Sequence, residues 1–142
     1  MLDKILCVDD DPITLMLCKK VVERVGFAKE IITAKHGLEA IEYFDNLFEE
    51  SKVNDSIVYP KLVLLDLNMP KLNGIEFLKI VKSNEATRHI PVIIFTTSNN
   101  HRDIASCYKI GISGYIIKPL KYEDYLVLVQ KTLEYWSSNE LL

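Results

Sequence analysis

The sequence has 142 residues, of which 49% are hydrophobic and 26% are charged, and its formal net charge is -3. These totals fit one globular domain with a substantial core, so we expect residues 1–142 to form a single domain with no separate output domain. The acidic balance and the lack of a basic block argue against nucleic acid as a direct partner. The apolar stretches fall short of the ~20 residues that a membrane-spanning helix needs, and Met1–Lys4 leaves no room for a signal peptide. We therefore expect a cytoplasmic protein that does not contact membranes.

Apolar runs alternate with helical patterns along the chain, which predicts five βα units in succession. The first predicted strand spans Lys4–Asp9. Asp11 then caps a helix that has Pro12 at its first position and stops at Gly26. The other predicted strands are Glu30–Thr33, Lys61–Asp66, a strand introduced by Pro91, and Gly114–Ile117. The other predicted helices start near Gly37, follow the turn Pro70–Gly74, span Asn99–Ile110 and span Tyr122–Trp136.

Two of these helices have well-defined apolar faces, which we expect to cover the sheet. The face of the helix near Gly37 consists of Ala40, Ile41, Phe44, Leu47 and Phe48. The stripe of the last helix consists of Leu126, Val129, Leu133 and Trp136. The polar segment Ser51–Tyr59 is the longest predicted loop.

The predicted strands are short and almost uniformly apolar, which is typical of a parallel sheet that is covered on both faces. Five such units predict a three-layer α/β fold, a doubly wound parallel sheet with the flavodoxin-like strand order 2-1-3-4-5. In sheets of this kind, ligands bind beyond the carboxyl ends of the strands, near the point where the strand order reverses. The residues that directly follow the strands are therefore the candidate functional residues.

Four predicted strands deliver polar side chains to this edge: Asp9 and Asp10, then Asp66, Thr96 and Lys118. Taken one at a time, each has an ordinary interpretation as a helix cap or a loop residue. Converging carboxylates repel one another, however, and a divalent cation relieves that repulsion. Oxygen ligands without cysteine or histidine favour magnesium or manganese over zinc. Together with the ammonium of Lys118, these strand-end residues predict a magnesium-dependent phosphoryl-transfer site with a carboxylate as the acceptor.

The cysteines and histidines do not form a recognisable metal or redox centre. Cys7, Cys18 and Cys107 contain no C-x-x-C pair, so we interpret them as small buried thiols in a reducing cytoplasm. The histidines lie beside predicted loops or helix ends and are interpreted as surface residues; they are His36, His89 and His101. The sequence therefore offers no zinc site.

Four motifs together resemble the receiver domain of two-component response regulators, the phosphoacceptor module typified by the chemotaxis regulator. They are Ile5–Asp10 (ILCVDD), Leu64–Pro70 (LLDLNMP) with Asn73-Gly74 beyond it, Ile93–Thr96 (IIFT) and Gly114–Pro119 (GYIIKP). Their order and spacing fit that family, and the resemblance covers Lys4 to Trp136. Each motif alone is a weak signal, whereas the combination is very specific. The resemblance implies a CheY-like fold.

The resemblance also implies roles for individual residues. Asp66 is the expected site of phosphorylation, Thr96 and Lys118 are expected to contact the phosphoryl group, and Tyr115 is the expected switch aromatic that moves inward with Thr96. The implied magnesium ligands, for which manganese can substitute, are Asp9 (mainly through water), Asp10, Asp66 and the backbone carbonyl of Asn68. The implied donor is the phosphohistidine of a sensor histidine kinase or phosphotransfer protein, and the implied target is a downstream protein. We expect no enzyme activity beyond self-phosphorylation and self-dephosphorylation.

Some features resemble a narrower group, the stand-alone receivers associated with phytochrome-type sensor kinases. These features are the long Ser51–Tyr59 loop, Thr96–Ser98 and the Tyr135–Trp136 tail. Two positions depart from the wider family: Asn73 stands where Asp is common, and Thr97 stands where Ala is preferred. The β-branched Thr97 could narrow access to the phosphoryl group and alter its lifetime.

Three alternative functions share parts of this pattern. A phosphatase of the haloacid dehalogenase class needs an acidic residue two positions after its aspartate, where this chain has Asn68, which cannot act as a general acid. A flavodoxin-like electron carrier needs a loop rich in hydroxyls and glycine after the first strand, where Asp9, Asp10 and Asp11 would repel a phosphate. A receiver-like scaffold that works without phosphorylation stays open, although none of the acidic, hydroxyl or lysine positions is missing.

A contact surface is expected on the fourth helix, the fifth strand and the last helix. These segments hold more aromatic and apolar side chains than one buried stripe can use: Tyr108, Tyr122, Tyr125, Leu128 and Tyr135. Exposed aromatic residues favour protein contacts, although scattered half-buried tyrosines are an ordinary alternative. Our first expectation is a symmetric homodimer through this face, and our second is a contact with the sensor kinase.

Overall fold

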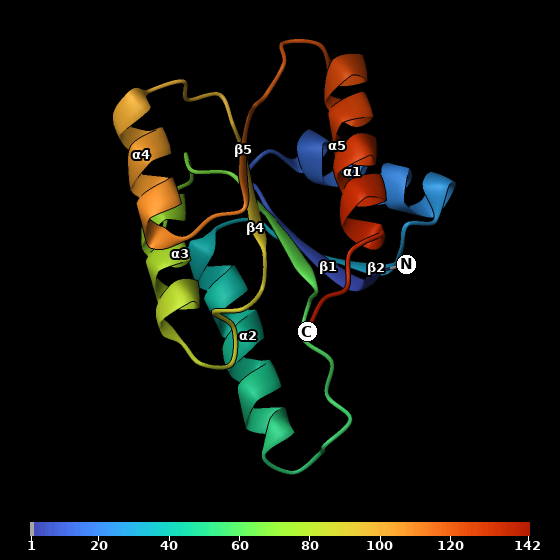
Figure 1. Cartoon of the computed structure of the whole chain (residues 1–142), viewed down its shortest axis with the longest axis vertical. Helices are drawn as coiled ribbons and strands as arrows, with labels where there is room; N and C mark the ends of the chain where they lie inside the picture. Colours follow the sequence, from blue (N-terminus) through green and yellow to red (C-terminus); the bar gives the residue numbers. More distant parts are fainter. Residues whose placement is uncertain (1) are drawn as a thin grey trace.

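Five parallel strands form one sheet in the order β2-β1-β3-β4-β5, and helices cover both of its faces (Figure 1). The structure is a computed structural model that describes residues 2–142. The strands are β1 (Leu2–Val8), β2 (Ala28–Ala34), β3 (Leu62–Leu65), β4 (Val92–Thr96) and β5 (Gly114–Ile117). The helices are α1 (Pro12–Val25), α2 (Gly37–Ser51), α3 (Gly74–Ser83), α4 (His101–Ile110) and α5 (Tyr122–Ser137). The predicted doubly wound, three-layer α/β fold and its strand order are confirmed.

The strands are apolar on both faces because each face of the sheet packs against its own layer of helices. Side chains alternate along a strand, so Leu62 and Leu64 of β3 pack toward α1 and α5. Val63 and Leu65 of the same strand pack toward α2, α3 and α4. Figure 1 shows these two helical layers on opposite sides of the sheet. The resulting division into two core clusters explains why the sequence shows continuous apolar runs instead of alternation.

The first helix begins and ends where the sequence predicts. The side chain of Asp11 accepts a hydrogen bond from the backbone N–H of Ile13 (3.0 Å), and Pro12 occupies the first helical turn. At the other end, Gly26 adopts a left-handed conformation with a φ of 69°, and its N–H donates to the carbonyl of Val22 (3.1 Å). Local sequence signals therefore determine both ends of α1.

Two predicted helix faces are only partly right. Phe48 is 46% exposed, because the C-terminal end of α2 extends past the sheet (Figure 1), and the Lys52 ammonium lies 5.1 Å from the centre of its ring. On α5, Val129 and Leu133 are fully buried as expected, whereas Leu126 and Trp136 are half-buried. Within residues 2–142, no helix is both long enough and apolar enough to cross a membrane.

Tyr125 was expected on the surface, and that expectation is wrong. Its side chain is 4% exposed, its ring packs edge-on against Phe95 with 5.7 Å between centroids, and its hydroxyl lies 3.2 Å from the sulfur of Cys18. Cys18 in turn lies 3.5 Å from the sulfur of Cys7. Tyr125 therefore belongs to the buried stripe of α5. The three cysteines are buried and free, as predicted.

Two further local predictions need adjustment. β2 is longer than Glu30–Thr33, because parallel pairing with β1 runs from Leu2 opposite Ala28 to Val8 opposite Ala34 and recruits residues of weak intrinsic preference. His36 is half-buried instead of lying freely on the surface. Its Nδ1 accepts a hydrogen bond from the N–H of Glu39 (3.1 Å) and so caps α2.

Candidate functional site

The register of the sheet brings the ends of β1, β3, β4 and β5 to one edge. Val8 lies opposite Leu65, and Leu65 lies opposite Ile94. The pairing continues past the strands. The N–H of Asp66 donates to the backbone carbonyl of Val8 (2.9 Å), and the N–H of Lys118 donates to the backbone carbonyl of Thr96 (2.7 Å). Residues that follow separate strands are thereby fixed side by side by backbone hydrogen bonds.

Three carboxylates converge at this edge. Asp9, Asp10 and Asp66 each offer one oxygen, and these oxygens lie within 4.8 Å of one another. Asp9 and Asp66 are buried, with 2% and 6% of their surface exposed, whereas Asp10 is open to solvent. An all-oxygen donor set with one open side fits a hard divalent cation that keeps some of its water. The cluster could therefore hold magnesium or manganese, while it lacks the nitrogen and sulfur ligands typical of zinc.

Lys118 joins two of these carboxylates. Its ammonium lies 2.6 Å from Oδ2 of Asp9 and 3.3 Å from Oδ2 of Asp66, and the side chain is 13% exposed. Charge-assisted hydrogen bonds of this kind are strong where water is largely excluded. The lysine therefore contributes one fixed positive charge to a group of three acids.

Burial has the largest effect on the pKa of Asp9. It raises the pKa of Asp9 to about 6, although the hydrogen bonds from Lys118 and from the N–H of Asp11 favour the charged carboxylate. For Lys118, burial alone would lower the pKa, but the hydrogen bond to Asp9 and the charges of Asp9 and Asp66 outweigh it, so the pKa is raised. The ammonium of Lys118 therefore stays charged, but it does not fully offset the effect of burial on the pKa of Asp9. Additional positive charge at this edge would favour the ionised form of Asp9.

The turn after β3 packs tightly beneath Asp66. The N–H of Asn68 donates to Oδ1 of Asp66 (3.2 Å), and the N–H of Gly74 donates to the carbonyl of Leu67 (3.0 Å). A Cβ atom at Gly74 would collide with the backbone of Asp66 and Leu67, so this position requires glycine. Asn73 caps α3 by accepting a hydrogen bond from the N–H of Glu76 (3.0 Å). The Asn73-Gly74 pair thus supports the position of the Asp66 carboxylate.

The predicted switch residues, Thr96 at the end of β4 and Tyr115 in β5, both contact Ser98 in the segment after β4. Thr96 is fully buried, and its Oγ1 accepts hydrogen bonds from Nδ2 of Asn68 (3.3 Å) and from the N–H of Ser98 (3.4 Å). The hydroxyl of Tyr115 donates to the carbonyl of Ser98 (2.8 Å), which ties the ring to this segment. Ser98 also donates to Oδ2 of Asp103 (2.8 Å), which links the segment to α4. Thr96 and Tyr115 are therefore connected through Ser98.

The side chain of Asn68 is a part of the site that the sequence did not predict. Only the backbone carbonyl of that residue and the absence of an acid at its position were considered. A usable signal was present, because Asn68 lies between Leu67 and Met69, which are both buried. A polar residue between two buried apolar neighbours points away from the core, which at this position means toward the strand-end site.

A family comparison agrees with this geometry. The model of the response regulator receiver domain matches residues 5–130 of the chain. The chain belongs to this family. The resemblance inferred from the motifs is thereby confirmed.

Individual relatives of this receiver domain extend the comparison. The chain is 37% identical over 132 residues to the probable methanogenesis regulatory protein FilR2 of Methanothrix harundinacea (strain 6Ac), with 93% of this chain and 82% of that protein covered. It is 32% identical over 132 residues to the response regulator Rcp1 of Synechocystis sp. (strain ATCC 27184 / PCC 6803 / Kazusa), with coverages of 93% and 87%.

Solved structures of response regulators share the fold of this receiver domain along nearly all of its length. The Mn(2+)-bound form of response regulator Rcp1 superposes with a TM-score of 0.87 at 30% identity, with 99% of each chain covered. The phosphorylated cyanobacterial phytochrome response regulator RcpA gives a TM-score of 0.85 at 29% identity, again with 99% of each chain covered. The likeness to phytochrome-associated receivers noted in the sequence is therefore also found in the structure.

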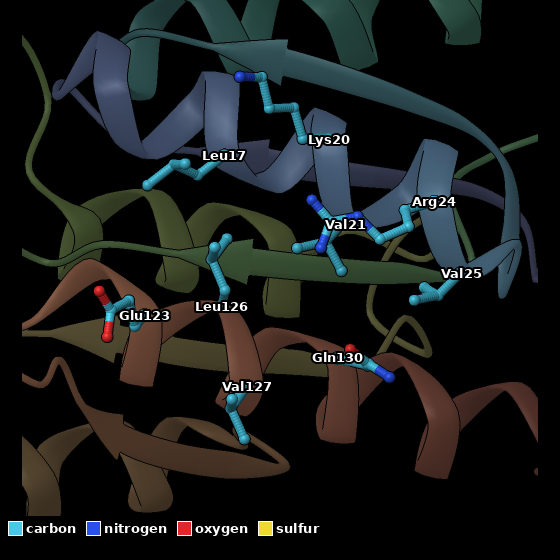
Figure 2. A pocket seen from close by; sticks show the side chains of 9 residues that line it. All are labelled: Leu17, Lys20, Val21, Arg24, Val25, Glu123, Leu126, Val127 and Gln130. Carbon is cyan, nitrogen blue, oxygen red and sulfur yellow. The ribbon is translucent and has the colours of Figure 1, made fainter.

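A groove between α1 and α5 is separate from the receiver's strand-end site. Figure 2 shows its lining, which includes the apolar residues Leu17, Val21 and Leu126 and the polar residues Lys20, Arg24 and Glu123. The groove encloses about 420 Å³, and neither the carboxylates nor Lys118 lines it.

Proposed function

We propose that this chain is the phosphoacceptor of a two-component phosphorelay. In this proposal, Asp66 receives a phosphoryl group from the phosphohistidine of a sensor histidine kinase or a phosphotransfer protein. The observation that carries the proposal is the meeting of Asp66 with Lys118 and two further carboxylates at one largely buried edge of the sheet. Membership of the receiver family supports the same assignment.

In the proposed reaction, a carboxylate oxygen of Asp66 attacks phosphorus and forms a new O–P bond. The N–P bond of the phosphohistidine breaks, and its electron pair returns to the imidazole. Lys118, 3.3 Å from the carboxylate, balances negative charge as the group arrives. The Thr96 hydroxyl donates a hydrogen bond to a phosphoryl oxygen. Positioning and charge stabilisation suffice for this step, because phosphoryl transfer asks little covalent chemistry of the protein.

We propose Mg²⁺ as the required ion, with Mn²⁺ as a possible substitute. Asp10, Asp66 and the backbone carbonyl of Asn68 would hold it directly, and Asp9 would hold it mainly through water. A bound divalent cation supplies positive charge that offsets the carboxylates and the phosphoryl oxygens. The convergence of three carboxylate oxygens and the Mn(2+)-bound form of Rcp1 support a divalent ion at this edge.

The proposed output is a change in protein contacts. A phosphoryl dianion on Asp66 attracts Thr96, and the Tyr115 ring follows into the space that becomes available, which shifts the population between two packings. The surface formed by α4, β5 and α5 would transmit this change, since Tyr108, Tyr122 and Tyr135 are 52%, 51% and 61% exposed. We propose a symmetric homodimer as the first partner of this surface and the sensor kinase as the second, with a downstream protein as the target of the switch. The chain then acts in the cytoplasm as a switch and not as an enzyme with a separate substrate.

Intact-mass analysis tests the proposal. Wild-type protein incubated with acetyl phosphate and Mg²⁺ should gain one phosphoryl group, and Asp66→Asn should gain none. Asp3→Asn, an exposed carboxylate at the opposite edge of the sheet, serves as the matched control and should be modified like wild type. Equal modification of wild type and Asp66→Asn would contradict the proposal. A folded wild-type protein that stays unmodified would favour the scaffold function instead.

A further inference from the structure

The hydroxyl of Thr96 is constrained by its two hydrogen-bond donors. A threonine hydroxyl can accept two hydrogen bonds and donate one. Nδ2 of Asn68 donates to Oγ1 of Thr96 at 3.3 Å, and the backbone N–H of Ser98 donates to the same atom at 3.4 Å. Thr96 has no exposed surface, so water does not reach its hydroxyl, whereas Asn68 is an exposed residue. With both acceptor directions in use, the O–H proton of Thr96 is left to donate in a third direction.

Asn68 also contacts the acceptor carboxylate. Its backbone N–H donates to Oδ1 of Asp66 at 3.2 Å, while its side chain donates to Thr96. Asp66 follows β3 and Thr96 ends the neighbouring strand β4, so one residue spans the two groups between which a phosphoryl group would lie. Neither of the two bonds to Thr96 uses its hydroxyl proton.

We propose that the side chain of Asn68 is a positioning residue for phosphoryl transfer. It keeps the Thr96 oxygen occupied as an acceptor, so that the Thr96 proton remains free to donate to a phosphoryl oxygen on Asp66. This inference rests on the proposed function. It concerns the side-chain amide, whereas the metal role proposed for Asn68 concerns its backbone carbonyl.

The chemistry of the amide explains why asparagine suits this position. A leucine would leave one acceptor direction of Thr96 unfilled, and the hydroxyl could then rotate. An aspartate would accept the Thr96 proton and compete with the phosphoryl group. The second donor is the backbone N–H of Ser98, which does not depend on the side chain at that position. The carbonyl of Ser98 accepts a hydrogen bond from Tyr115, and its hydroxyl donates to Asp103, so the residue is fixed in place. Both bonds to Thr96 are long, and hydrogen bonds often tighten only when the reacting group is present.

The test is a double-mutant cycle on the phosphorylation rate with acetyl phosphate at saturating Mg²⁺. Asn68→Leu should lower the rate roughly three- to tenfold, as expected for one hydrogen bond. Thr96→Val should lower it at least as much. The double variant should equal Thr96→Val alone, because Asn68 acts through the Thr96 hydroxyl. Asn99→Leu, an exposed asparagine beside Ser98, is the matched control and should behave like wild type.

Several results would overturn this inference. If wild type and Asp66→Asn are modified equally, or neither is modified, the proposed function fails and takes the inference with it. If wild type alone is modified and Asn68→Leu reacts at the wild-type rate, only the inference fails. Losses that multiply in the double variant would show that Asn68 acts independently of Thr96. If Asn68→Leu lowered the affinity for Mn²⁺ by the same factor as the phosphorylation rate, Asn68 would act through the metal.

Asn68→Ala serves as a second variant, because it removes the same donor and must reproduce the result of Asn68→Leu. Thermal unfolding of both variants verifies that they are folded.

Discussion

The two edges of the sheet both carry lysine–carboxylate pairs, but the pairs differ in burial. At the carboxyl edge, Lys118 and Asp9 are 2.6 Å apart, with side chains that are 13% and 3% exposed. At the amino edge, Lys29 and Asp3 are 3.2 Å apart, with side chains that are 67% and 50% exposed. Exposed pairs contribute little to stability, whereas removing one partner of a buried pair leaves an uncompensated charge. The same residue types therefore form a solvated pair at one edge and a largely buried cluster at the other.

The largest expected difference between the edges is in phosphorylation. Lys118→Met removes the ammonium shared by Asp9 and Asp66, and we expect the rate with acetyl phosphate to fall about 100-fold, as for other preorganised charge stabilisers. Lys29→Met, the matched change at the amino edge, should leave the rate unchanged. Intact-mass time courses measure both rates. A similar rate for the two variants would remove the functional distinction between the edges.

A divalent ion should stabilise the protein through the carboxyl edge alone. Binding at a concentration of about 100 times its Kd adds roughly 2.7 kcal/mol to the free energy of unfolding. We expect Mn²⁺ to raise the thermal midpoint and a chelator to reverse the increase. Asp10→Ala should lose the effect, while Asp3→Asn should keep it. Calorimetric scans of the three proteins provide the measurement, and an undiminished increase in Asp10→Ala would refute the assigned ligand.

Asp9 should make the metal-free protein less stable as the pH rises. Its folded pKa of about 6 lies above the ordinary aspartate value of about 4, so the folded state binds more protons between these values. The free energy of unfolding that Asp9 contributes is present below about pH 4 and is lost as the pH rises through about 6. Asp9→Asn should remove this slope, while Lys118 keeps Asp66 as a charged partner at 3.3 Å. Urea unfolding with a chelator measures the effect, and a wild-type slope in Asp9→Asn would assign the proton to another group.

The smallest effect is expected at the amino edge. Asp3→Asn breaks an exposed pair with Lys29, and we expect it to change the free energy of unfolding by less than about 0.5 kcal/mol. High salt should leave the difference between this variant and wild type close to zero. Urea unfolding at low and high salt measures it. A loss above about 2 kcal/mol would mean that this pair is energetically comparable to buried ones.

The sequence predicted the fold and the meeting of the strand-end residues because both follow from short-range patterns. The apolar runs before Asp9, Asp66 and Thr96 mark buried strands, and parallel strands necessarily end at a common edge. The helix signals of Asp11 and Gly26 are equally local, since each acts on backbone groups a few residues away. Where a residue's environment is set by its own neighbours in the chain, the sequence was sufficient.

The failures concern contacts between distant segments. Tyr125 was placed on the surface because its burial depends on Phe95 and Cys18, which belong to β4 and α1. The side-chain bond from Asn68 to Thr96 was missed because it joins residues 28 positions apart across two strands. The buried neighbours Leu67 and Met69 indicate the direction of the Asn68 side chain, but no helical or strand period identifies Thr96 as its partner. Three-dimensional packing alone defines it.

The contact between Asp9 and Lys118 also has a consequence for biosynthesis. These residues are 109 positions apart, so most of the chain lies between the two ends of one ion pair. A nascent polypeptide that has not yet released β5 from the ribosome carries all three acids but lacks their ammonium partner. Until β5 has folded onto the sheet, the three acids therefore face one another without the ammonium that Lys118 supplies in the folded protein.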